Sequence, residues 1–222
     1  MSKQITLDLS SPAIKHLCNR DKRMQKIISM VGSITYTVHT DGYSFLIHEI
    51  IEQMLSIKAG EKIYSRLVKL CDGKITPDRI YSLSFDEIKG TGTAAAKVQY
   101  IKNLTEKILS KELVLSELDT LSDSAVIEVL TSIRGIGAWT AKMYLIFVLD
   151  RPDVLPYEDG AFLQSYKWAY KTNDLSHTAI KKKCHKWHPY SSIAARYMYR
   201  ALDIGLTKKE FHLFKEENTN GT

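Results

Sequence analysis

Residues 130–141 read LTSIRGIGAWTA, with Gly135 and Gly137 on either side of Ile136 and a helical pattern before and after them. Because glycine tolerates positive φ and lets another backbone come close, the stretch predicts a tight turn between two helices, with Ile136 packed between them. The amides after the turn would point outward at the start of the second helix, where N–H groups and the helix dipole bind phosphate. The same spacing also fits an ordinary corner between two helices.

Apolar residues recur at helical spacing on both sides of this turn. One face of residues 123–133 carries Val126, Leu130 and Ile133, and a second helix is expected over residues 138–149. Residues 34–39, ITYTVH, alternate and predict one short extended piece. Further helices are expected over about residues 22–31, 44–57, 60–70, 93–110, 160–170, 177–186 and 190–204. The sequence therefore predicts an all-α protein with little or no sheet.

The bulk composition restricts the class of protein. The chain has 222 residues, 44% of them hydrophobic, which is enough to bury one large domain or two small lobes. Three widely separated cysteines, Cys18, Cys71 and Cys184, argue against a disulfide framework and against a cysteine-rich metal site. The sequence has no apolar run of membrane-spanning length and no apolar leader, so we expect a reduced, intracellular protein without a membrane partner.

The charge is unevenly distributed along the chain. The formal net charge is +6 and the pI about 9.0, and the whole excess falls in residues 161–222. A basic C-terminal third suits a phosphate-bearing partner, although many soluble proteins are also mildly basic. These side chains are candidates for phosphate contacts, or else form a solvated face: Lys181, Lys182, Lys183, Lys186, Arg196 and Arg200, with Lys183 and Lys186 foremost.

The pattern LxxIxGIGxWTAxM, from Leu130 to Met143, is followed by a proline-containing loop and an aspartate. This arrangement resembles the helix-hairpin-helix (HhH-GPD) DNA glycosylase superfamily, in particular its DNA-3-methyladenine glycosylase II branch. Asp159 lies 24 residues after Gly135, at the end of VLPYED, in the register of the family's catalytic aspartate; Glu158 is one residue early. Residues 45–59, 92–101 and 187–192 resemble other family segments, so the resemblance spans roughly residues 10–205.

The resemblance implies a two-lobed helical fold with the helix-hairpin-helix motif, at about residues 124–149, and Asp159 at the cleft. We assign residues 1–43 and 146–222 to one lobe, because the chain would run back on itself. Residues 44–145 would form the other lobe, which contains most of the motif.

The implied activity is that of a monofunctional DNA glycosylase in base excision repair. Such an enzyme flips an alkylated purine, such as 3-methyladenine or 7-methylguanine, out of double-stranded DNA and hydrolyses its N-glycosidic bond. The Asp159 carboxylate would stabilise the positive charge that develops on the sugar, with Glu158 as the alternative. An alkylated purine is already cationic and leaves without strong acid assistance, so one carboxylate suffices. Asp159 also suits a helix N-cap, alone or in addition.

The residue at position 139 separates two branches of the superfamily. In the lyase branch a lysine here forms a Schiff base, whereas this chain has Trp139, whose π-face suits an electron-deficient flipped base. Lys142 follows three residues later and is expected on a solvated helix face, with a displaced Schiff-base lysine as the alternative. Met143 is a further base-pocket candidate. Tyr43, Phe45 and the weaker candidate Trp187 complete the set, and each aromatic residue, Trp139 included, has a packing role in the core as its alternative.

The remaining assignments concern DNA. By resemblance, Met54 occupies the position of an intercalating leucine; its long apolar side chain would fill the gap left by the flipped base, unless it belongs to the core. Gln53 is a candidate hydrogen-bond partner of DNA. Phosphate contacts are expected at the hairpin from Gly135, Gly137 and Thr140. Na⁺ or K⁺ on the carbonyls of Ile133 and Ile136 could bridge to the same phosphate; no cofactor is required, and a monomer is expected.

Three departures from the family pattern bear on substrate range. Ser191 stands where relatives usually have arginine, Met54 replaces the usual glutamine or leucine, and residues 160–164 lack the common Leu-Gly-x-Arg-Arg. Two other functions remain open. One is a bifunctional glycosylase/lyase, against which Trp139 and the lack of four clustered cysteines argue. The other is a non-catalytic helix-hairpin-helix DNA-binding protein, which would not need Asp159.

Overall fold

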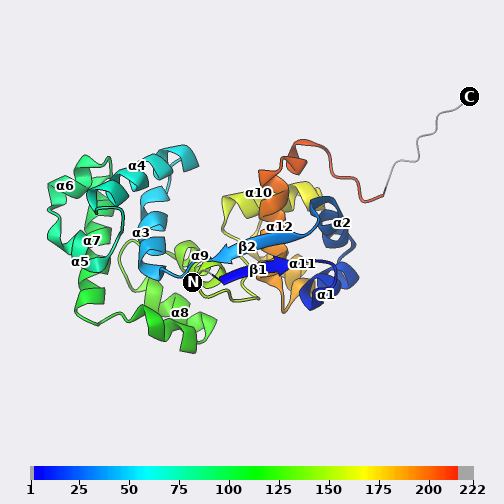
Figure 1. Ribbon diagram of the computed structural model, residues 1–222. Helices are drawn as coiled ribbons and strands as arrows, with labels where there is room; N and C mark the ends of the chain where they lie inside the picture. The colour runs from blue at the N-terminus through cyan, green and yellow to red at the C-terminus, as the bar shows by residue number, and fades with distance from the viewer. Residues whose placement is uncertain (1–2, 215–222) are drawn as a thin grey trace, which may run out of the picture. The chain divides into compact units, whose positions relative to one another are not determined.

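The computed structural model describes residues 3–214, and within them the chain forms two compact units (Figure 1). The middle unit comprises Lys3 and residues 38–150, and the terminal unit comprises residues 4–37 and 151–214. The sequence predicts that the two units divide after residues 43 and 145, but both positions lie inside helices, α3 and α9. The observed divisions leave both helices whole, as expected for a helix, which is one hydrogen-bonded rod.

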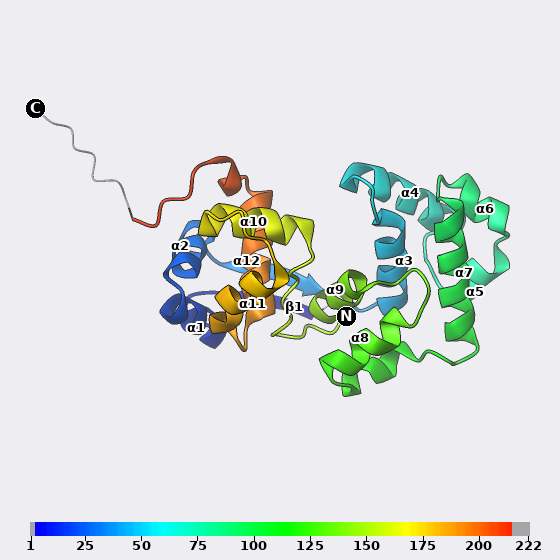
Figure 2. The ribbon, with the colours of Figure 1, turned by 180° about the vertical axis from the view of Figure 1, so that it is seen from behind.

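The middle unit contains α3 (Gly42–Glu52), α4 (Ile57–Leu70), α5 (Pro77–Ser82), α6 (Phe85–Gly90), α7 (Ala95–Leu109), the 3-10 helix η1 (Leu115–Thr120), α8 (Asp123–Thr131) and α9 (Ala138–Phe147). Helix α3 starts where the Asp41 side chain accepts a hydrogen bond from Ser44 N (2.9 Å). It packs against α4, α7 and α9 (Figure 2). Its Leu46, Ile47 and Ile50 are fully buried.

The sequence predicted one long helix over residues 44–57 and another from Gly60, and this was wrong at the junction. Helix α3 ends at Glu52 and α4 begins at Ile57, with Ser56 as its N-cap. Gly60 lies inside α4, where a Cβ would come within 2.7 Å of Glu52 Cγ. A side chain at position 60 would therefore crowd that of Glu52. Residues 53–56, where a helix was expected, form the turn between α3 and α4.

The terminal unit contains all but one end residue of each of the strands β1 (Lys3–Leu7) and β2 (Ile34–Val38). Its helices are α1 (Pro12–Arg20), α2 (Lys22–Val31), α10 (Gly160–Tyr170), α11 (His177–Cys184), η2 (His185–Trp187), α12 (Ser191–Asp203) and η3 (Leu206–Lys208). Helix α12 packs on α2 and α10 around a core that includes Ile14, Leu17, Phe162, Ala194 and Met198.

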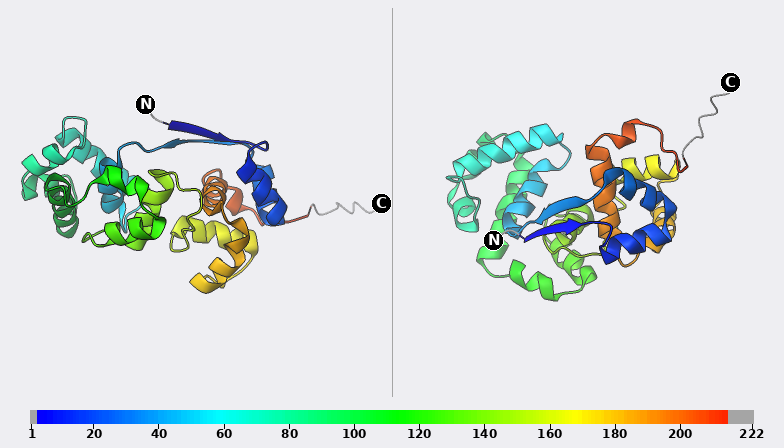
Figure 3. Two further views of the ribbon diagram at one scale, coloured as in Figure 1. Left: turned by 90° about the horizontal axis from the view of Figure 1, so that it is seen from below. Right: turned by 45° about the vertical axis from the view of Figure 1, so that its right-hand side comes forward.

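Strands β1 and β2 form a two-stranded sheet, seen side by side in Figure 3. The extended piece predicted near residues 34–39 is confirmed as β2, whereas β1 was not predicted. The fold is otherwise helical, as expected. None of the helices within residues 3–214 combines the length and the apolar character needed to span a membrane.

Candidate functional site

The glycine turn lies between α8 and α9, and its two glycines differ in whether the structure requires glycine there. Gly135 has φ +96°, and a Cβ there would lie 2.3 Å from Tyr100 Cγ, so both the backbone conformation and the space require glycine. Ile136 is buried, and its N–H donates to the Ile133 carbonyl (3.0 Å). Gly137 is the N-cap of α9, has ordinary φ, and has open space where a Cβ would stand. The start of α9 is therefore accessible at Gly137.

Gln53 holds this turn from the side. Its Nε2 donates to the Gly135 carbonyl at 2.9 Å, and its own carbonyl accepts from Lys97 Nζ at 2.5 Å. The side-chain amide that we had assigned to DNA thus binds the protein's own hairpin. This contact could not be predicted from the sequence, because its partners are 82 residues apart.

Met54 follows in a conformation that is unusual for its residue type. Gln53 has φ −47° and ψ 127°, Met54 has φ +58°, and Leu55 N donates to the Glu52 carbonyl (3.0 Å), which is close to a type II turn. The second central position of that turn normally holds glycine or asparagine. The Met54 side chain is fully exposed, at 101% of its reference area, so the alternative of a core methionine is wrong.

The base-pocket candidates of the middle unit divide into exposed and buried residues. Trp139 lies in the first turn of α9 and is partly exposed, and Met143 is buried one turn later. Tyr43 is buried with its hydroxyl 2.7 Å from Thr105 Oγ1, and burial raises the pKa of its phenol. Phe45 is buried against Tyr144. Tyr43 and Phe45 therefore pack in the interior of this unit, the role given above as their alternative.

Two further expectations on α9 were wrong. Thr140 is 1% exposed, so its hydroxyl is not presented to a phosphate. Lys142 is 7% exposed and thus buried, not on a solvated face. Helix α9 is apolar on nearly all sides, which is typical of a buried helix.

Asp159 belongs to the terminal unit, where it is the N-cap of α10. Its Oδ1 accepts from Phe162 N (2.8 Å), and its carbonyl accepts from Leu163 N (2.8 Å). The predicted capping role is confirmed. A carboxylate at this place is stabilised by the positive end of the helix dipole, and the capping bond fixes its rotamer. The structure thus provides a buried, oriented carboxylate.

The loop that leads to Asp159 is tied to the start of α12. Asp153 Oδ1 accepts from the Ser191 hydroxyl (2.6 Å) and from Ser191 N (3.0 Å), and its Oδ2 makes a hydrogen bond with His188 Nδ1. Ser192 Oγ accepts from Val154 N (2.8 Å). Ser191, which replaces the usual arginine, therefore serves to anchor this loop.

The six basic residues proposed for phosphate contacts differ in their exposure. Lys186 Nζ lies 3.1 Å from the buried Asp21 carboxylate. Burial alone would raise the pKa of Asp21, but the hydrogen bonds from Tyr170, Trp187 and Lys186 outweigh this effect and lower it. Lys186 and the pocket candidate Trp187 are therefore structural.

Lys183 remains exposed on α11, together with Lys181 and Lys182. Arg196, in contrast, is buried with its guanidinium carbon 3.7 Å from the centre of the Tyr36 ring. Of the six basic candidates, the three lysines of α11 and Arg200 keep the exposure that phosphate contacts need.

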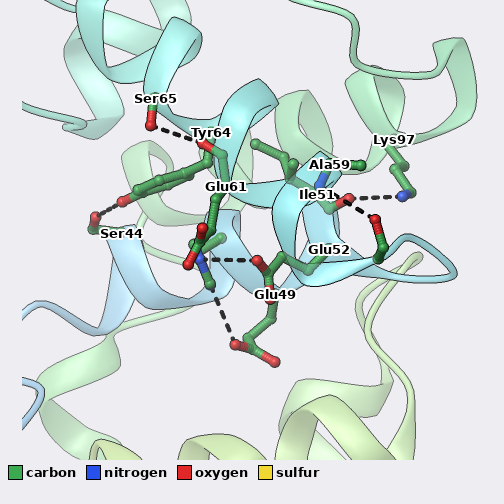
Figure 4. A network of polar contacts seen from close by, with 11 residues as sticks. Ser44, Glu49, Ile51, Glu52, Ala59, Glu61, Tyr64, Ser65 and Lys97 are labelled. Atoms are coloured by element: carbon green, nitrogen blue, oxygen red, sulfur yellow. Dashed lines mark hydrogen bonds and ion pairs between the residues drawn. The ribbon is translucent and has the colours of Figure 1, made fainter.

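A polar network lies between α3 and α4, beside the turn that carries Met54 (Figure 4). His48 Nδ1 is 3.4 Å from Glu49 Oε1, and His48 Nε2 is 3.4 Å from Glu52 Oε1. The hydrogen bond to Glu49 raises the pKa of His48, against the effect of burial, and the charge of Glu52 adds to it. Burial raises the pKa of Glu52.

This network predicts that stability decreases as pH rises. A histidine whose folded pKa is raised contributes stability that is complete below its unfolded pKa, about 6.5, and is lost as pH rises through the folded value. The raised pKa of Glu52 acts in the same direction at lower pH. We expect His48→Gln to flatten the fall in the free energy of unfolding between about pH 6 and 8. Urea unfolding across this range checks it; parallel curves for both proteins contradict it.

Comparisons with known proteins agree with these observations. Residues 47–189 match the model of the HhH-GPD superfamily base excision DNA repair proteins. The chain is 28% identical to DNA-3-methyladenine glycosylase 1 of Schizosaccharomyces pombe over 205 residues, covering 89% of this chain and 90% of that one.

Two solved structures are similar over nearly the whole chain. The DNA-3-methyladenine glycosidase of Bacillus halodurans matches with a TM-score of 0.84 and 30% identity, covering 94% of this chain and 97% of the other. The 3-methyladenine DNA glycosylase of S. pombe, solved in complex with abasic DNA, matches with a TM-score of 0.79 and 27% identity, over 88% and 98%.

Proposed function

Because the chain belongs to the HhH-GPD superfamily of base excision DNA repair proteins, we propose that it is a monofunctional DNA glycosylase acting on alkylated purines in double-stranded DNA. The observation that carries this proposal is the buried Asp159 carboxylate, oriented by its capping bond to Phe162 N. The relatives named above are 3-methyladenine glycosylases, which supports the substrate class. We place its action inside the cell, on DNA, as a monomer.

Asp159 supplies electrostatic stabilisation. As the N-glycosidic bond of an alkylated purine breaks, positive charge develops on the deoxyribose, and the fixed carboxylate stabilises it. The base leaves as a neutral molecule because it was cationic beforehand, so no second acid is required. Trp139 stands where the lyase branch has its Schiff-base lysine, and the product is therefore an uncut abasic site.

Binding of DNA is assigned to the hairpin and its neighbours. The open amides at Gly137 bind a backbone phosphate, and Lys183 adds long-range attraction. The carbonyl oxygens of Ile133 and Ile136 are hard, neutral donors that suit Na⁺ or K⁺, which would bring positive charge to the same phosphate. Trp139 stacks on the flipped base, and Met54 fills the gap that the base leaves.

Base release from methylated duplex DNA tests the function. The purified protein is incubated with the DNA, the freed bases are separated, and the strand is probed for breaks with and without alkali. Release of methylated purines with strand breaks only after alkali supports the proposal. Breaks without alkali indicate the lyase alternative. DNA binding without base release indicates the non-catalytic binding protein.

The exposed Met54 gives a prediction for base flipping. Met54→Ala removes the side chain but keeps a non-glycine residue at φ +58°, whereas Met54→Gly removes the side chain and relieves the backbone. We expect both variants to release bases from duplex DNA on the order of tenfold more slowly, and only Met54→Gly to be more stable than the wild type. Single-turnover release and thermal unfolding check it. Wild-type rates in both variants would exclude the wedge.

A further inference from the structure

The proposed function leaves the side chain of Lys97, in the segment at residues 92–101, without a role. It lies on α7 and reaches the end of α3, where its Nζ donates to the carbonyl of Ile51 (2.8 Å; Figure 4). The same Nζ donates to the carbonyl of Gln53 (2.5 Å). These are carbonyls that a helix end leaves without an intrahelical partner. An ammonium group at this place also complements the negative end of the helix dipole.

The turn that follows needs such support. A helix often ends with glycine in the left-handed conformation, whereas this chain has Met54 at φ +58°. A non-glycine residue there carries a conformational cost, and it persists only where the surroundings fix the backbone. The fixed points are the two carbonyls held by Lys97 and the hydrogen bond from Gln53 Nε2 to the Gly135 carbonyl.

We propose that Lys97 is a positioning residue that holds the turn of residues 52–55, so that Met54 projects into DNA in register with the phosphate-binding hairpin. The lysine fixes the backbone on one side of Met54, and Gln53 joins the same backbone to the turn at Gly135. All these residues belong to the middle unit. The inference rests on the proposed wedge role of Met54, but not on base hydrolysis.

Lys102 offers a matched control on the same helix. Its Nζ donates to the carbonyls of Ile80 (3.1 Å) and Tyr81 (3.2 Å) and also to that of Leu83, at the end of α5. It therefore makes the same kind of contact with a helix end that carries no DNA-binding assignment. Lys97→Met and Lys102→Met both remove an ammonium group and keep most of the side chain.

The first measurement compares affinities for two short duplexes that differ only in one tetrahydrofuran abasic-site analogue. We expect the wild type to prefer the abasic duplex, because the gap there receives Met54. In Lys97→Met, the affinity for the abasic duplex should fall on the order of tenfold, which removes this preference, while the affinity for the intact duplex should change little. Lys97→Arg should restore part of it. Lys102→Met should keep the wild-type pattern.

The second measurement is a thermal double-mutant cycle between Lys97→Met and Met54→Gly. We expect Lys97→Met to lower Tm by about 3 °C in the wild type and by less than half as much in the Met54→Gly background, because glycine adopts the turn unaided. Additive shifts would overturn the inference, as would an unchanged abasic preference in Lys97→Met. Equal losses for both duplexes, or in Lys102→Met, would do the same.

The outcomes separate this inference from the proposed function. A protein that releases no bases but shows the expected affinities and thermal coupling refutes hydrolysis and leaves the role of Lys97 standing. A wild type without preference for the abasic duplex overturns the wedge, and with it the role of Lys97, whatever its glycosylase activity.

Discussion

Asp159→Asn is expected to slow the release of alkylated purines at least about a hundredfold while the protein stays folded. The substitution removes the negative charge that stabilises the sugar in the transition state. It keeps an acceptor oxygen where Asp159 Oδ1 now binds Phe162 N at 2.8 Å, and asparagine caps helices about as well as aspartate. The rate should therefore fall without a matching loss of stability. Single-turnover release from a duplex with one alkylated purine measures the rate.

Two other substitutions make this result specific to the carboxylate of Asp159. Glu158→Gln removes a neighbouring charge and should leave the rate within about twofold, since Glu158 lies outside the family register and is not the helix cap. Asp159→Ala removes both charge and cap, and should also cost about 1 kcal/mol of stability. If Asp159→Asn releases bases at the wild-type rate, or if Glu158→Gln is the slow variant, Asp159 is not the catalytic group.

The parts of the molecule that local chemistry dictates were predictable from the sequence. The turn at Gly135 follows from glycine spacing, and the cap at Asp159 follows from an aspartate between a loop and an apolar helix. The extended residues of β2 follow from their alternation. In each case the deciding residues are neighbours in the chain, so pattern and structure agree.

The contacts that position these parts were not predictable, because they join residues far apart in sequence. In the sequence, Gln53 has the pattern of a polar helix residue, yet its side-chain amide donates a hydrogen bond to the Gly135 carbonyl. Lys186 belongs to a run of basic residues in the sequence, yet its side chain forms an ion pair with Asp21, 165 positions earlier in the chain. Apolar periodicity also ran through Met54 and predicted a continuous helix. The available signal against it was Ser56, a good N-cap residue just before α4.

Gly135→Ala is expected to be the most disruptive substitution in the hairpin. Its Cβ would lie 2.3–2.5 Å from Cβ, Cγ and Cδ2 of Tyr100, which are too near the backbone to move aside easily. It would also hold alanine at φ +96°. Overpacking and strain together should cost about 3 kcal/mol and displace the Gly135 carbonyl from Gln53. We expect lower Tm and loss of affinity for duplex DNA.

Gly137→Ala is the matched control, because its Cβ would meet open space and its backbone has ordinary φ. It should fold with stability within about 1 kcal/mol of the wild type. Tyr100→Ala should recover part of the stability lost in Gly135→Ala, since it removes the clash but not the backbone strain. If Gly135→Ala is as stable as Gly137→Ala, the turn has an alternative backbone path. The rigid presentation of the α9 amides, on which the proposed phosphate binding depends, would then be excluded.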